Sequence, residues 1–138
     1  MVKTAVGIQV RPLEVRAPDD LDSVITAVAT EPLDALLTLL DGYVAEVVAI
    51  STKAQLPAMC EARGFTMAGG LMSYGPNPLV WYGRAVDYID RILKGAIPAD
   101  LPVQQPADIE LVVTMKSAQE IGFMIPPSIL MQAAEVIR

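Results

Sequence analysis

The chain has 138 residues, of which 53% are hydrophobic and 19% are charged, and its net charge is −6. This length suits one domain with a real core, and the acidic balance argues against nucleic acid as a partner. The sequence has no histidine and a single cysteine, Cys60, so it lacks the commonest metal ligand and general base and cannot form an internal disulfide.

The first half of the chain alternates predicted strands and helices. Residues 6–15 alternate between apolar and polar side chains, which predicts a strand. Asp19 and Asp20 then precede an amphipathic helix that begins at Leu21 and ends at Pro32. The next predicted elements are a strand over 35–40, a helix over 43–54, and strands over 56–60 and 71–74. This rhythm is typical of βαβ units and predicts an α/β fold, with a Rossmann-like parallel sheet and flanking helices.

The second half contains the longest predicted helix, over residues 79–94. Tyr82, Ala85, Ile89 and Ile92 lie on one face of it, and Gly95 is placed to end it. Prolines exclude a helix over the connector 98–106. A strand over 108–115, a single turn over 117–121 and a terminal helix over 127–138 complete the chain.

Several long segments carry a resemblance to a known family: GGLMSYGPN (69–77), YGRAVDYIDRILKGAIPADLPVQQP (82–106) and IELVVTMKSAQEIGFMIPPSIL (109–130). Together with PLEVRAPDDLDS (12–23) and LPAMCEARGFTMAGG (56–70), they closely resemble the C-terminal part of ABC-transporter substrate-binding proteins of the tryptophan/tyrosine-uptake-like type. The resemblance covers nearly the whole chain. It implies part of a periplasmic-binding-protein fold of the first type, in which two α/β lobes face each other across a cleft.

The resemblance also implies a division of the chain between the lobes. Residues 1–70 would form most of the C-terminal lobe, and residues 71–106 a crossover and a helix that complete the N-terminal lobe. Residues 107–138 would supply a returning strand and the terminal helix. Because members of the family are longer and begin with an export signal, we expect this chain to be a truncated fragment or remnant.

Ligands of open α/β folds bind beyond the carboxyl ends of the strands, where loops and helix N-termini offer hydrogen-bond donors. The candidate ligand-binding residues at such positions are Asp41, Tyr43, Cys60, Ser73, Tyr74 and Asn77. In the resembled family these loops line the cleft between the lobes. There an aspartate would hold the ammonium group of an amino-acid-like ligand, while hydroxyl groups and loop amides would hold its carboxylate.

Each of these residues also has a purely structural interpretation. Asp41 and Gly42 fit ordinary turn chemistry, and Asn77 before Pro78 fits a helix N-cap. Tyr74 fits a half-buried ring, and Cys60 an inert buried side chain, since no histidine exists to activate it.

The sequence thus predicts a non-enzymatic solute-binding component of an ABC transporter, with a membrane permease as its partner in the intact family and with no cofactor or metal. The alternative is a freestanding flavodoxin-like domain that acts in regulation or protein interaction. An enzyme is disfavoured because the chain has no glycine-rich phosphate fingerprint, no metal-ligand spacing and no nucleophile–base pair.

Location and assembly are further expectations. The resemblance implies a periplasmic or other extracytoplasmic location, whereas residues 1–10 lack the features of a signal peptide, so the chain expressed as written would stay in the cytoplasm. No apolar run reaches the length of a transmembrane helix. Because the apolar face of helix 79–94 would lack its natural sheet, we expect a homo-oligomer that covers it.

Overall fold

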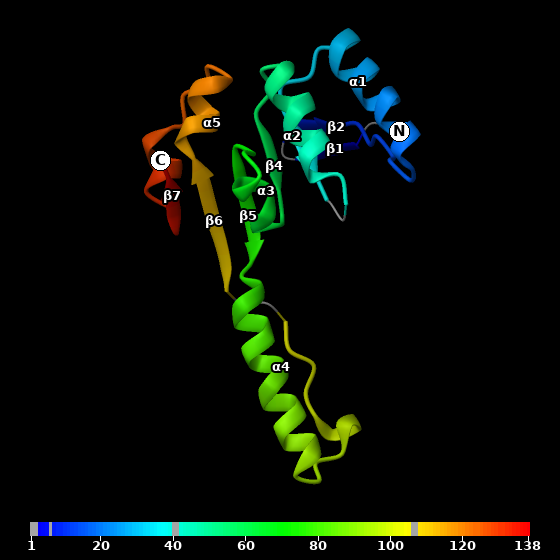
Figure 1. The fold of residues 1–138 in the computed structure, drawn as a ribbon, viewed down its shortest axis with the longest axis vertical. Coiled ribbons are helices and arrows are strands. Elements are labelled where there is room, and N and C mark those ends of the chain that lie inside the picture. The colour runs from blue at the N-terminus through cyan, green and yellow to red at the C-terminus, as the bar shows by residue number, and fades with distance from the viewer. Residues whose placement is uncertain (1–2, 6, 40–41, 106–107) are drawn as a thin grey trace. The chain divides into compact units, whose positions relative to one another are not determined.

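The computed structural model describes residues 3–5, 7–39, 42–105 and 108–138, in two compact units over residues 1–34 and 35–138 (Figure 1). In the first unit, β1 (Lys3–Ala5) pairs antiparallel with β2 (Ile8–Val10). The predicted strand over 6–15 is wrong in extent, because β2 begins after the turn at Gly7, with φ of 79°, and ends before Pro12, which cannot donate a ladder hydrogen bond. A 3₁₀ turn, η1 (Pro18–Asp20), leads into α1 (Leu21–Thr30), which confirms the predicted helix.

The second unit is built around a five-stranded sheet with the order β3-β4-β5-β6-β7. Its strands are β3 (Leu36–Thr38), β4 (Ala58–Cys60), β5 (Met72–Pro76), β6 (Ile109–Thr114) and β7 (Glu135–Ile137). The pairs β3–β4, β4–β5 and β6–β7 are parallel, and β5–β6 is antiparallel. The predicted α/β fold with a mostly parallel sheet is confirmed.

Helices and 3₁₀ turns connect these strands. They are α2 (Val44–Lys53), α3 (Arg63–Met67), α4 (Pro78–Leu93), η2 (Pro98–Asp100), α5 (Met115–Glu120) and α6 (Pro127–Leu130). Helices α2, α3 and α5 pack on the sheet, whereas no residue of α4 is buried. The bounds of α4 confirm the prediction, and Gly95, with φ of 101°, follows its end. The sequence prediction missed the short helix α3.

The predicted terminal helix over 127–138 is wrong beyond its first turn. The chain continues from α6 into β7, whose residues Glu135, Val136 and Ile137 pair with residues 112–114 of β6. A three-residue strand leaves almost no periodic signal, so its pairing with a distant strand decides its conformation.

The core lies on both faces of the sheet. Register partners on neighbouring strands share a face, which places Cys60, Ser73 and Val112 on one side and Met72 and Val113 on the other. On the first side, Phe65 of α3 and Val47 of α2 pack with Cys60. On the second side, Ala118, Ile121 and Ile125 pack with Val113. Burial on both faces is expected for a sheet with parallel crossovers.

Candidate functional site

The carboxyl ends of β3, β4 and β5 point to one edge of the sheet, because these three strands are parallel neighbours, and β5 continues three residues beyond Ser73, the register partner of Cys60. The chain segments that follow them are the loop before α2, the turn before α3, and the start of α4. In parallel α/β sheets this edge is the usual place for a ligand. We call it the carboxyl edge.

The loop after β3 brings Tyr43 to this edge. Tyr43 is the N-cap residue of α2 and is half-buried. The first turn of α2 offers backbone N–H groups without partners inside the helix, which suit an anionic group. Asp41, the other candidate in this loop, lies outside the described residues.

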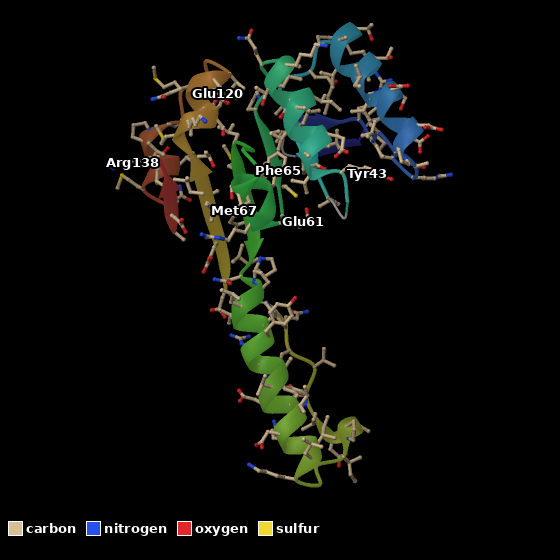
Figure 2. The ribbon with its side chains drawn as sticks, in the orientation of Figure 1. Tyr43, Glu61, Phe65, Met67, Glu120 and Arg138 are labelled. Atoms are coloured by element: carbon tan, nitrogen blue, oxygen red, sulfur yellow. The ribbon has the colours of Figure 1, made fainter. Side chains whose placement is uncertain are left out.

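At the end of β4, the side chain of Cys60 is fully buried, and its thiol donates a hydrogen bond to the Glu61 carboxylate over 3.4 Å. Its register partner Ser73 is 2% exposed, so both side chains lie within the sheet rather than on its edge. Glu61, which follows Cys60 in sequence, is the polar side chain at the turn after β4 (Figure 2).

The strand predicted over 71–74 continues to Pro76, so Tyr74 lies within β5 and Asn77 follows its end. The side chain of Tyr74 is 54% exposed. Asn77 caps α4, since its Oδ1 accepts from the Leu79 N–H over 3.0 Å, and its Nδ2 donates to both carboxylate oxygens of Glu110 over 3.0 and 3.2 Å. The capping interpretation of Asn77 is confirmed, and the contact with Glu110 is an addition to it.

A hollow of about 370 Å³ lies beside Asn77 at the base of α4. Its lining includes Arg63, Asn77, Leu79, Glu110, Ala134 and Glu135. Arg63 Nη2 lies 2.6 Å from Glu135 Oε2, so an ion pair joins the start of α3 to β7. The charged groups in this hollow are one guanidinium and two carboxylates.

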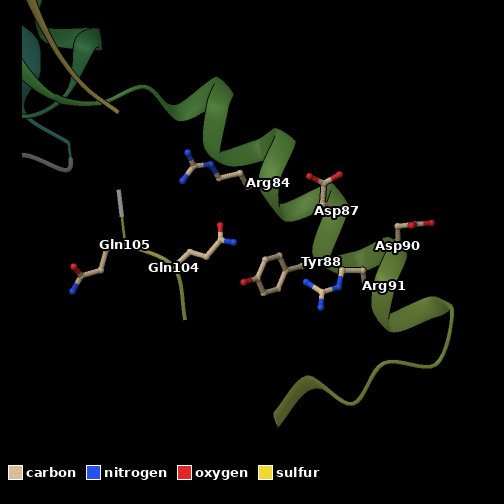
Figure 3. A pocket seen from close by; sticks show the side chains of 7 residues that line it. All are labelled: Arg84, Asp87, Tyr88, Asp90, Arg91, Gln104 and Gln105. Atoms are coloured by element: carbon tan, nitrogen blue, oxygen red, sulfur yellow. The ribbon is translucent and has the colours of Figure 1, made fainter. Parts of the chain in front are cut away.

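A second hollow, of about 740 Å³, lies between α4 and the connector that follows it (Figure 3). Arg84, Tyr88 and Arg91 line it from α4, and Gln104 and Gln105 line it from the connector. The Tyr88 hydroxyl donates to the carbonyl of Pro102, which holds the connector along the helix. This groove was not predicted, and its residues come from outside the carboxyl edge.

Within the described ranges, no group of three or more His, Cys, Asp or Glu residues is arranged to hold a metal ion. In the same part of the chain, no helix has both the length and the apolar character needed to cross a membrane.

Sequence reasoning missed Glu61, Glu110 and Glu135. Glu61 is one residue beyond the predicted end of β4, so the rule that selected Cys60 nearly reached it. Glu110 reaches Asn77 through the antiparallel pairing of β6 with β5, and Glu135 lies on a strand predicted to be helical. Their positions depend on contacts that no local pattern encodes.

Small-molecule ligands of open α/β sheets usually bind at such a carboxyl edge. The sequence matches the family described as ABC transporter substrate binding protein over residues 2–137, so the chain belongs to that family. Proteins of this family bind solutes and are not enzymes. None of the curated proteins matches the sequence.

Solved structures share this fold. An ABC domain from Streptococcus pneumonia in complex with L-Trp is 29% identical, with a TM-score of 0.81 over 95% of this chain and 46% of that one. A conserved domain protein from Vibrio cholerae O1 biovar El Tor is 24% identical, with a TM-score of 0.76 over 86% of this chain and 41% of that one. A ligand-free, open substrate-binding protein with adhesive properties from Clostridium difficile is 20% identical, with a TM-score of 0.63 over 89% and 42%. The chain therefore spans less than half the length of these proteins.

Proposed function

We propose that this chain is a solute-binding component of an ABC transporter and that it contacts an amino-acid-like ligand at the carboxyl edge. The observation that carries the proposal is the convergence of three parallel strand ends at one edge in a member of this family. The similarity to a protein in complex with L-Trp supports the ligand class.

The chemistry of the edge fits a zwitterion. The N–H groups in the first turn of α2 suit a carboxylate, and the acidic side chains Asp41 and Glu61 suit an ammonium group. Tyr43 and the exposed ring of Tyr74 would contact the remainder of the ligand, and Asn77, whose amide is engaged by Leu79 and Glu110, would border it. Cys60 and Ser73 are buried, so they would not contact the ligand themselves. We assign them the role of positioning the residues that follow them in sequence, Glu61 after Cys60 and Tyr74 after Ser73.

The division into lobes belongs to the same proposal. Residues 1–70 form most of one lobe, residues 71–106 a crossover and a helix of the other, and residues 107–138 return to the first. A ligand favours closure of two lobes only through contacts that it makes in the closed state and not in the open state. The closed form would present a surface to a permease on the extracytoplasmic side of the membrane, as the family suggests.

We further propose that a second copy of this chain covers α4. None of the sixteen residues of α4 is buried, and Leu79, Val86 and Ile89 are 76%, 62% and 55% exposed. An isolated helix of this length is marginal in water, and an apolar face of this kind favours a protein partner. Sedimentation over a concentration series should show reversible self-association.

Replacing Ile89 by Glu should weaken that association, because the apolar face of α4 formed by Leu79, Val86 and Ile89 would then carry a charge. Met124→Glu is the matched control, since Met124 is 88% exposed and lies in the segment between α5 and α6. A monomer at all concentrations, or equal effects of the two variants, would contradict the second-copy proposal.

A thermal-shift screen against the common amino acids, run beside light scattering, tests the ligand proposal. We expect an increase in Tm with a subset of zwitterionic amino acids, since a ligand that binds only the folded state stabilises it. Glu61→Gln should reduce the shift, whereas Glu120→Gln, on α5, should leave it unchanged. Stabilisation by none of the amino acids would refute the assigned ligand class, and a shift that Glu61→Gln leaves unchanged would refute the assigned site.

A further inference from the structure

At the base of α4, the segment that enters the helix and the segment that returns to the sheet lie side by side. Strand β5 ends at Pro76 and α4 begins at Pro78, while the connector returns to the sheet at Ile109 in β6. Pro76 is the register partner of Ile109, and Gly75 is the partner of Glu110. Among the described residues, these two adjacent segments are the covalent links between α4 and the sheet.

Asn77 joins the two segments through both ends of one side-chain amide. Its Oδ1 accepts from the backbone N–H of Leu79 in the first turn of α4. Its Nδ2 donates to the carboxylate of Glu110 on β6, at 3.0 and 3.2 Å. Because the amide group is planar, engaging both ends at once fixes the first turn of the helix relative to the strand.

The neighbouring ion pair supports the same arrangement. Arg84 Nη2, two turns into α4, lies 2.6 Å from Asp108 Oδ2, immediately before β6 begins. Since no residue of α4 is buried, little apolar packing fixes the direction of this helix. Polar contacts at the base of α4 therefore fix its direction.

We propose that Asn77 and Glu110 are positioning residues that form a clasp, and that this clasp sets the direction in which α4 leaves the sheet. The clasp adjoins the carboxyl edge, because Asn77 follows β5 directly. A change in the direction of α4 would thus move the start of the helix relative to the proposed ligand. Only this last step rests on the proposed function.

Distances between spin labels on α4 and on α5 test the clasp without any ligand. Cysteines introduced at Asp87 and Lys116, in a Cys60→Ala background, would carry the labels, and dilution with unlabelled chain would restrict the signal to distances within one chain. We expect a single narrow distance distribution. Asn77→Asp keeps an oxygen that can cap α4, but it replaces the Nδ2 donor by a carboxylate oxygen that faces the carboxylate of Glu110. The repulsion between the two carboxylates should broaden and shift this distribution.

The rescue variant separates a positioning role from general damage. In the double variant Asn77→Asp/Glu110→Gln, the new amide can donate to the new carboxylate, which should restore the narrow distribution. Asp100→Asn, on η2, is the control and should change nothing. A folded Asn77→Asp variant with an unchanged distribution would overturn the proposal, and so would a double variant that is no narrower than the single one.

The outcome is independent of ligand binding. If no amino acid stabilises the protein but the label distances change as described, the clasp stands and the proposed function fails. If amino acids bind and the distances do not respond to Asn77→Asp, the clasp fails alone.

Discussion

Gly75 of β5 lies against the backbone of Glu61, at the turn that follows β4. A Cβ atom on Gly75 would come within 1.9 Å of the Glu61 carbonyl oxygen. Only a residue without a side chain permits this approach, and it brings the end of β5 beside the turn that carries Glu61. The geometry of the carboxyl edge therefore depends on a glycine that contributes no functional group.

Replacing Gly75 by Ala should lower the free energy of unfolding by about 3 kcal/mol, because the contact is with backbone and neither segment can move away cheaply. Urea denaturation measures the change. Gly83→Ala is the matched control, since a Cβ there meets nothing within 4 Å and α4 would gain about 1 kcal/mol in helix propensity. Equal stability of the two variants would contradict this account of the edge.

Gly70 has a similar relation to Phe65. A Cβ on Gly70 would lie 2.2 Å from two ring carbons of Phe65, whose side chain is fully buried. Gly70→Ala should therefore displace the ring and cost about 2 kcal/mol, with loss of packing around Phe65. Gly64→Ala, in α3 and with open space around its Cβ, should not be destabilising. Thermal unfolding followed by circular dichroism compares the two, and a Gly70→Ala variant as stable as the control would be evidence against this packing.

Two buried threonines should respond in opposite directions to the same substitution. Thr114 Oγ1 is buried and finds no hydrogen-bond partner among the described residues, whereas Thr66 Oγ1 donates to the carbonyl of Arg63 over 2.8 Å. Thr114→Val should be neutral or stabilise by about 1 kcal/mol, and Thr66→Val should destabilise by about 1 kcal/mol. Urea denaturation of the pair decides the point, and a large loss in Thr114→Val would show that its hydroxyl group has a partner.

Asp20 should make stability depend on pH in the acid range. The backbone N–H groups of Arg16 and Ala17 donate to its carboxylate over 2.7 and 3.0 Å, which lowers the pKa of Asp20 from its ordinary value of 3.8. Since the folded-state pKa is the lower one, the stabilisation is present above pH 3.8 and is lost as the pH falls through the folded-state pKa.

An NMR titration of the Asp20 carboxyl group measures this pKa directly. Asp20→Asn should be less stable than the parent protein near neutral pH, and the difference should shrink in acid. Asp19→Asn is the charge-matched control. A difference between Asp20→Asn and the parent that does not change with pH would exclude this role of the carboxylate.

Much of the fold could be predicted from the sequence where local signals were strong. Helix α4 has an asparagine–proline start, a long apolar face and a glycine end, and its bounds differ from the prediction by one residue at each end. The three parallel strands were found because apolar runs alternate with helices. Strand β7 was missed because its three residues take their conformation from pairing with β6.

The sequence indicated which edge of the sheet carries the candidate site better than it indicated which side chains lie there. Residues at or just after predicted strand ends were chosen, which led to Tyr43 and Asn77 in the loops and to Tyr74, which the structure places within β5. The same rule also chose Cys60 and Ser73, whose burial follows from a face of the sheet that the sequence alone does not reveal. Glu110 could not be found, since only the antiparallel return of β6 brings it to Asn77.

Mapping the amides of the ¹⁵N-labelled chain during titration with L-Trp tests the central claim most directly, because weak binding is still visible residue by residue. We predict chemical-shift changes confined to residues 43–46, 61–62 and 74–77, and smaller changes with tryptamine, which lacks the carboxylate. Changes confined to the groove of residues 84–105, or none up to the solubility limit of L-Trp, would contradict a ligand site at the carboxyl edge.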